Sequence, residues 1–206
     1  MDVTGVIELI ETIGKTRNQE LKGSMNWNNQ QTKFKITNSI LAMSNIRNGG
    51  IIIFGANEMK DKTYDPVGLD LSDFQSFDID NIPDHIGKYA SPYATFRLEK
   101  IDNGNKRFIV ISIQEFDEFP VICKKAYYVD DKPELQVGDI CTRTRNTKPQ
   151  SSKITSFLDM KDIIDLAIEK GVRLFVERTD KAGLLSNVNY DQNDETKFME
   201  QLSDFF

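Results

Sequence analysis

The sequence contains few of the residues that common catalytic and metal sites require. Among its 206 residues there are two cysteines and one histidine. Without His85 no Ser-His-Asp or Cys-His arrangement can be assembled. Cys123 and Cys141 are too far apart in sequence for a typical zinc site, whose ligands are closely spaced. Ordinary hydrolase chemistry and structural zinc are therefore disfavoured, and the sparse cysteines predict a reducing, cytoplasmic environment.

Long apolar runs are also absent. The longest runs, of which residues 51–54 are one, have four residues, whereas a membrane-spanning helix needs about 20. The first residues include neither a basic nor an apolar stretch, so we expect no secretory signal and no membrane association. Neither a G-x-x-x-x-G-K-[ST] motif nor a G-x-G-x-x-G motif is present, so no motif supports ATP binding.

Charge is unevenly distributed along the chain. The net charge is −6, but residues 1–60 have a surplus of bases. Residues 141–153 (CTRTRNTKPQSSK) contain four bases and no acid, whereas the middle of the chain and its C-terminal part are acidic. A polyanionic partner would therefore have to bind a local patch that the two basic segments form together.

Hydrophobic spacing predicts interleaved helices and strands. Apolar residues recur at helical spacing in residues 3–13, 30–46, 70–90 and 194–206. Runs typical of strands occupy residues 19–23, 51–54, 94–102, 106–114, 121–124 and 139–144. A further helical region is expected to begin at Ser151 or Ser152. Between the second helix and the buried strand, Asn48-Gly49-Gly50 is a strong helix stop.

This order of elements predicts an α+β fold with a mixed, largely antiparallel sheet flanked by helices. We expect a core domain at residues 1–150 and a C-terminal helical extension at residues 151–206. The terminal amphipathic helix has an apolar face with no obvious core to cover, so packing on its own domain and binding of a protein partner both stay open.

One tripeptide has the chemistry of a catalytic site. If Glu20-Leu21-Lys22 is a strand, the Glu20 and Lys22 side chains project from the same face. A carboxylate can hold Mg²⁺, and a neighbouring lysine can neutralise a phosphate in metal-assisted phosphodiester cleavage. Glu58 follows the strand at residues 51–54 and comes near Glu20 if the two strands are neighbours. For the bare tripeptide, an ordinary surface Glu-Lys pair is the far more frequent explanation.

Several segments, taken in order, resemble the Schlafen AlbA-type domain. The similarity rests on an E-x-K element, a following helix, a glycine pair, a buried strand ending in an acid, and three later segments. These are ELK at 20–22, ILAMSN at 40–45, GGIIIFGANE at 49–58, EFD at 115–117, PVICK at 120–124 and GDICTR at 138–143. With the helical segment FLDMKDIIDLA at 157–167, the resemblance covers roughly residues 5–175 and is typical of bacterial single-lobe members.

The resemblance implies a mixed α/β fold and a nucleic-acid-binding role, and in nuclease members a three-carboxylate metal site that cuts transfer or ribosomal RNA. Glu20 matches the acid of the E-x-K element, and Glu58 lies on or beside the acid after the buried strand. Lys15 stands where the first carboxylate of the nuclease pattern would be. A cation there repels Mg²⁺, so the carboxylate set is incomplete.

Three functional hypotheses follow. In the first, the chain binds RNA or DNA phosphates through a basic groove without reading sequence. The expected contacts are Lys15, Arg17, Lys22, Arg47, Arg143, Arg145 and Lys148. Trp27 and Tyr93 could stack on unpaired bases in the same groove.

In the second hypothesis the chain is a ribonuclease that depends on Mg²⁺ or Mn²⁺, with Glu20 and Glu58 as metal ligands and catalytic residues and Lys22 as charge neutraliser. In the third it is a non-enzymatic module that binds a protein.

Because animal relatives have two such lobes around a groove and this chain has one, we also expect a homodimer.

Overall fold

The computed structural model describes residues 2–13, 16–146 and 148–183. The chain divides into two compact units, Met1–Ala167 and Ile168–Phe206. The elements, in chain order, are α1 (Val3–Ile13), β1 (Gln19–Lys22), α2 (Gln30–Ser44), β2 (Gly50–Phe54), β3 (Asn57–Glu58), β4 (Tyr64–Asp65), α3 (Leu71–Ser76), α4 (Asn81–Gly87), β5 (Ala90–Ser91), β6 (Phe96–Asp102), β7 (Arg107–Ile113), β8 (Ile122–Cys123), β9 (Tyr127–Val129), β10 (Lys132–Leu135), β11 (Cys141–Arg143), β12 (Ser151–Lys153) and α5 (Phe157–Lys181).

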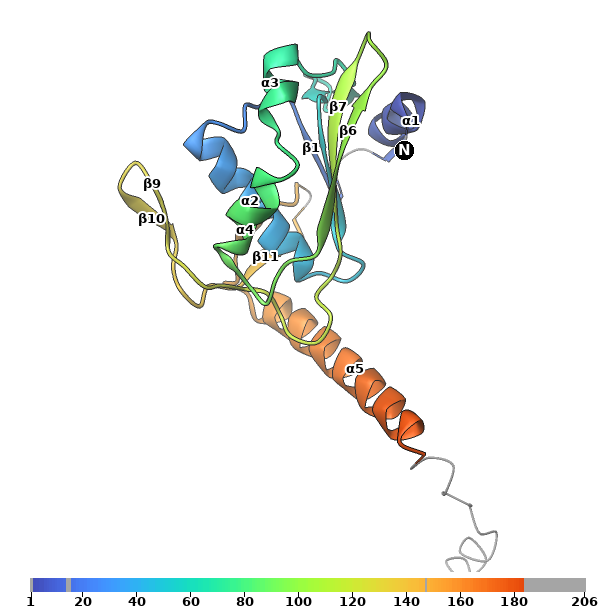
Figure 1. The fold of residues 1–206 in the computed structure, drawn as a ribbon, viewed down its shortest axis with the longest axis vertical. Helices are drawn as coiled ribbons and strands as arrows, with labels where there is room; N and C mark the ends of the chain where they lie inside the picture. The colour runs from blue at the N-terminus through green and yellow to red at the C-terminus, as the bar shows by residue number, and fades with distance from the viewer. Residues whose placement is uncertain (1, 14–15, 147, 184–206) are drawn as a thin grey trace, which may run out of the picture. The chain divides into compact units, whose positions relative to one another are not determined.

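A four-stranded sheet with the order β1-β2-β7-β6 forms the centre of the first unit (Figure 1). The β1 strand runs parallel to β2, with Glu20 opposite Ile52. The β2–β7 and β7–β6 pairs are antiparallel, and so are the four two-stranded ribbons. The predicted α+β fold with a mixed, largely antiparallel sheet is confirmed.

Helices cover both faces of this sheet (Figure 1). On one face α1 buries Val6 and Ile10 against strand residues that include Leu21 and Ile53. On the other face α2 packs the larger core, to which β2 contributes Ile52. Because strand side chains alternate between faces, Glu20 and Lys22 lie on the side of α2.

The connection from α2 to β2 explains the glycine pair. Asn29 caps the start of α2 by accepting hydrogen bonds from two backbone amides. After the helix, Gly49 has φ of +60°, and a Cβ atom there would lie 2.1 Å from the carbonyl oxygen of Ile113. A Cβ on Gly50 would lie 2.6 Å from the sulfur of Met43. Only glycine permits this close approach of helix and strand.

The structure differs from the expected elements at several places, including the unexpected short strands β3, β4 and β5. Ser151 and Ser152 do not begin a helix; they belong to β12, which pairs with β11, and α5 begins only at Phe157. The β9–β10 hairpin was not expected, and its turn places Asp130 and Asp131 at positive φ. The helix expected at 194–206 lies outside the described residues.

Within the part of the chain that the structure describes, no helix has the length and apolarity that crossing a membrane requires.

Candidate functional site

The E-x-K element forms a buried ion pair. The Nζ atom of Lys22 donates a hydrogen bond to Oε1 of Glu20 over 2.8 Å, and Glu20 is only 7% exposed. The prediction that these two side chains share one face of a strand is therefore confirmed. An exposed pair of this kind would contribute little, but burial makes each charge depend on its partner.

Arg143 completes a triad with Glu20 and Lys22. It reaches the other carboxylate oxygen of Glu20 from β11, with 3.3 Å between Nη1 and Oε2, and its side chain has no exposed surface. Its Nε also donates to the backbone oxygen of Arg17 over 3.2 Å. The structure does not support the expected phosphate contact of Arg143, because its guanidinium group is fully buried. Its role is to neutralise Glu20.

The charges around Glu20 decide its ionisation. Burial alone would raise the pKa of this carboxyl group, but the opposite charges of Lys22 and Arg143 and hydrogen bonds from Lys22 and Ser39 lower it below its ordinary value. Glu20 is therefore an anion at neutral pH, held between two cations.

These surroundings fit poorly with a metal site. Both carboxylate oxygens of Glu20 already face cations, and a third positive charge at this position would be repelled. Glu58 has a different partner from Glu20: its Oε1 accepts a hydrogen bond from Nζ of Lys148 over 2.6 Å. Among the described residues, no group of three or more His, Cys, Asp or Glu side chains could hold a metal ion. Lys15 lies outside the described residues.

Two other arginines converge on one carboxylate of α5. Arg17 Nη1 donates to Asp162 Oδ2 over 3.1 Å, and Arg145 Nη2 donates to the same oxygen. Asp159, one turn earlier, lies 3.7 Å from Arg17 and 4.0 Å from Arg145. The structure thus brings the basic loop at 141–153 to Arg17, as the sequence predicts, but it also places acids between the bases.

We call Arg17, Arg47 and Arg145 the arginine cluster. The three side chains line a hollow of about 260 Å³ in the first unit. The other lining residues are Asn45, Ile46, Asp162, Asp165 and Leu166. Burial tends to raise the pKa of Asp162, but hydrogen bonds from Arg145 and Arg17 outweigh this effect and lower it. The hollow therefore contains the ionised carboxylate of Asp162 beside guanidinium groups at neutral pH.

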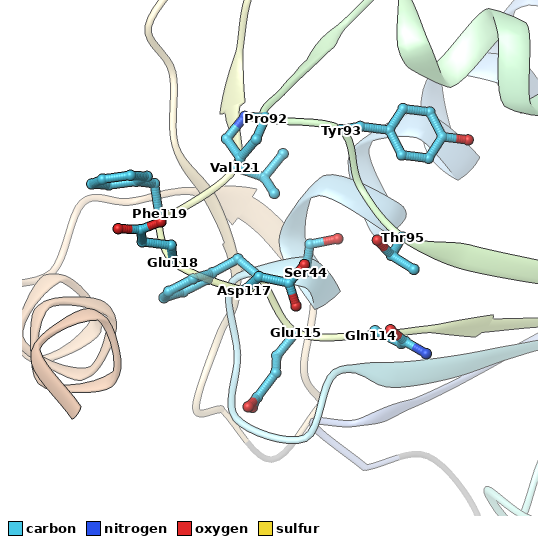
Figure 2. Close-up of a pocket in the computed structure, with 11 residues that line it drawn as sticks. Ser44, Pro92, Tyr93, Thr95, Gln114, Glu115, Asp117, Glu118, Phe119 and Val121 are labelled. Atoms are coloured by element: carbon cyan, nitrogen blue, oxygen red, sulfur yellow. The ribbon is translucent and has the colours of Figure 1, made fainter. Parts of the chain in front are cut away.

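The two aromatic residues expected to stack on bases have different surroundings. Trp27 is 4% exposed and packs against Phe77 and His85, so it cannot receive a base. Tyr93 is 55% exposed and lines a second hollow, of about 210 Å³, together with acids that include Asp117 (Figure 2). This hollow has carboxylates and no arginine or lysine among its lining residues, so its surroundings do not support the expected stacking of Tyr93 on bases.

The sequence does not predict the contacts of the acids of α5. Asp159 and Asp162 lie in the segment FLDMKDIIDLA, whose pattern predicts only a helix, and nothing in the sequence links them to bases far away in the chain. The available signal was the spacing of three residues, which places both carboxylates on one side of a helix.

Comparison with protein-family models identifies the family of this chain. The family model described as Schlafen, AlbA_2 matches residues 15–151. The chain belongs to the Schlafen AlbA_2 family. The match includes the whole central sheet, the triad of Glu20, Lys22 and Arg143, and the arginine cluster. The search of curated proteins found no match to this Schlafen AlbA_2 chain.

Two solved structures are similar to this Schlafen AlbA_2 chain. One is the DIP2311 protein from Corynebacterium diphtheriae, at 14% identity and a TM-score of 0.44 over 73% of this chain. The chain spans only 25% of that protein's length. The other is the N-terminal domain of a protein from Nitrosomonas europaea named "putative ATP-dependent DNA helicase RecG-related protein". It has 16% identity and a TM-score of 0.44, with 71% of this chain and 94% of that one covered.

Proposed function

We propose that this protein binds nucleic acid by its phosphates, through Arg17 and Arg145 with Arg47 beside them. One observation supports the proposal above all: two guanidinium groups from distant parts of the sequence donate to a single oxygen of Asp162. Arginine pairs recognise carboxylate and phosphate oxygens with the same planar donors. The cluster is therefore arranged around an oxyanion, and a phosphate oxygen would find the same donors. Membership of the Schlafen AlbA_2 family supports the same class of ligand.

In this account Asp162 and Asp159 occupy the place of the ligand. A nucleic acid would have to displace their ion pairs before its phosphates reach the arginines. The overall charge of −6 also opposes approach of a polyanion. We therefore expect weak, strongly salt-dependent binding that does not depend on base sequence, since phosphate contacts have no sequence information.

Filter binding of a labelled single-stranded RNA and of a DNA duplex tests the proposal. The variants are Arg17→Ala and Arg145→Ala, each expected to weaken binding of both probes several-fold. The matched control is Arg97→Ala, since the Arg97 side chain is 79% exposed and pairs with Glu99 on β6. Binding that is absent in the wild type, or that falls equally in the control, contradicts the proposal.

A metal-dependent ribonuclease using Glu20 and Glu58 has less support in the geometry. Each carboxylate already has a cationic partner, and those partners differ.

As to location, we propose the cytoplasm, because Cys123 and Cys141 are both free and buried and no disulfide is needed. We also propose a homodimer, on the ground that animal relatives with two such lobes form a groove between them and this chain has one lobe.

A further inference from the structure

A separate hollow of the first unit lies among the start of α2, the end of α3 and α4. Its volume is about 430 Å³, which is in the size range of pockets that bind small molecules. We call it the Trp27 hollow. The lining residues with charge or aromatic character are Trp27, Lys33, Asp78, His85 and Lys88, and most of the others have side-chain amides.

Two lysines bring positive charge to the Trp27 hollow from different helices. Lys33 belongs to α2, and Lys88 directly follows α4. The Nζ atom of Lys33 lies 5.8 Å from the centre of the Trp27 ring, a cation–π contact. Among the described residues neither lysine forms an ion pair. In a chain whose 32 acids outnumber its 26 bases, this leaves two cations available to a ligand.

The one carboxylate that lines the Trp27 hollow is bound to the start of α4. Asp78 accepts hydrogen bonds from the backbone amides of Asp80 and Asn81 and from the side-chain amide of Asn81. The two backbone bonds hold the pKa of Asp78 below its ordinary value, so it is ionised at neutral pH. Two lysines against one aspartate leave the hollow with a surplus of one positive charge while His85 is neutral.

The surroundings of His85 agree with that surplus. Its ring packs edge-on against Trp27, with ring centres 5.3 Å apart, and its Nε2 lies 3.4 Å from the hydroxyl oxygen of Tyr127. Burial, and after it the charges of Lys33 and Lys88, lower the pKa of His85 to about 4, and none of the described carboxylates opposes them. The titratable groups that face the ring are Lys33 of α2, Lys88 and Tyr89 after α4, and Tyr127 of β9.

The donors of the Trp27 hollow fit a phosphate that is attached to a polar group. Lysine amines bind phosphate as point charges. The side-chain amides of Asn28 and Gln75 line the same hollow and have no hydrogen-bond partner among the described residues. Amides both donate to and accept from hydroxyl groups. Since a free phosphate would fill only a small part of the volume, a sugar phosphate suits the hollow better.

We propose that the Trp27 hollow binds a small sugar phosphate, with Lys33 and Lys88 on the phosphate and Asn28 and Gln75 beside the sugar. The site does not depend on the proposed nucleic-acid binding, because no residue lines both this hollow and that of the arginine cluster.

The chain has one tryptophan and one histidine, and both line the hollow, so each provides a signal without labelling. Fluorescence of the untagged full chain is measured during titration with ribose 5-phosphate, inorganic phosphate and ribose, with sodium chloride holding the ionic strength constant. We expect a saturable change with ribose 5-phosphate, weaker binding of inorganic phosphate and no change with ribose. In proton NMR, bound ribose 5-phosphate should raise the pKa of His85 from about 4 toward 6.5, because an anion stabilises the imidazolium form.

Two variants test the lysines by calorimetry, since removing Lys33 would itself change the Trp27 fluorescence. Lys33→Ala and Lys88→Ala should each weaken binding of ribose 5-phosphate by about fivefold. The matched control is Lys35→Ala. Lys35 is exposed on α2 and does not line the hollow, so its loss changes the net charge equally and should leave the affinity unchanged.

Three results would overturn the inference. The first is no binding of ribose 5-phosphate at constant ionic strength. The second is an equal loss of affinity in Lys35→Ala, which would show that only net charge matters. The third is a change in Trp27 fluorescence with single-stranded RNA and with neither small phosphate, which would assign the hollow to nucleic acid. Filter binding by Arg17→Ala and Arg145→Ala tests the proposed function separately.

Discussion

Asp162→Asn is the substitution whose effect the structure predicts most specifically. Asparagine has the shape of aspartate but no charge, so the variant releases Arg17 and Arg145 from a carboxylate that both contact. Partly exposed ion pairs contribute up to about 1 kcal/mol each. Because the Arg145 side chain is 51% exposed and that of Arg17 28%, we expect about 1 kcal/mol in total. The affinity for single-stranded RNA should therefore rise about fivefold.

The assay is filter binding at fixed salt, with Asp165→Asn as control. Asp165 lines the same hollow and its loss changes the net charge equally, but it pairs with Lys161 on its own helix. We expect a much smaller rise for the control. If Asp162→Asn binds no better than the wild type, the acids of α5 do not compete with the ligand. If both variants rise equally, only net charge matters and the arginine cluster has no special role.

Three further predictions concern stability, its dependence on pH, and catalysis. Glu20→Gln should lower the free energy of unfolding by about 3–5 kcal/mol in urea titrations, because Arg143 would lose its buried counter-charge; Glu58→Gln, whose ion pair is exposed, should lower it by less than about 1 kcal/mol. Burial and two nearby lysines lower the pKa of His85 from 6.5 to about 4, so the fold favours neutral His85. The contribution of neutral His85 to the free energy of unfolding is complete above pH 6.5 and is lost as the pH falls toward 4. His85→Phe should therefore lose less stability in acid than the wild type. Identical curves of unfolding free energy against pH for the two proteins would refute the reasoning. Transfer RNA incubated with Mg²⁺ or Mn²⁺ should stay intact as it does with chelator, and metal-dependent cleavage that Glu20→Ala abolishes would favour the nuclease instead.

Local patterns in the sequence predicted much of the fold. The alternation of side chains along a strand placed Glu20 and Lys22 together, and the helix, glycine pair and apolar strand appear as α2, Gly49-Gly50 and β2. The strand β12 was missed because Ser-Ser-Lys has little intrinsic strand preference. Its strand conformation comes from pairing with β11. The residues of β12 taken alone do not reveal that pairing.

The candidate site was predicted less completely, since its character depends on contacts between distant residues. The convergence of Arg17 and the basic loop was expected, but the burial of Arg143 was not. A charged side chain in a basic segment reads as a surface residue, and only the packing of β11 against α2 buries it. The Arg17–Asp162 contact spans 145 positions, and charge counts along the chain cannot predict such a pairing.

The slope of binding constant against salt tests the central claim most directly. For single-stranded nucleic acid, the logarithm of the binding constant falls by about 0.7 per phosphate contact for each tenfold increase in salt. If Arg17 and Arg145 each contact a phosphate, Arg17→Ala and Arg145→Ala should each reduce the slope by about 0.7, and Arg97→Ala should leave it unchanged. Slopes that are identical in all four proteins would show that the arginine cluster does not bind the nucleic acid.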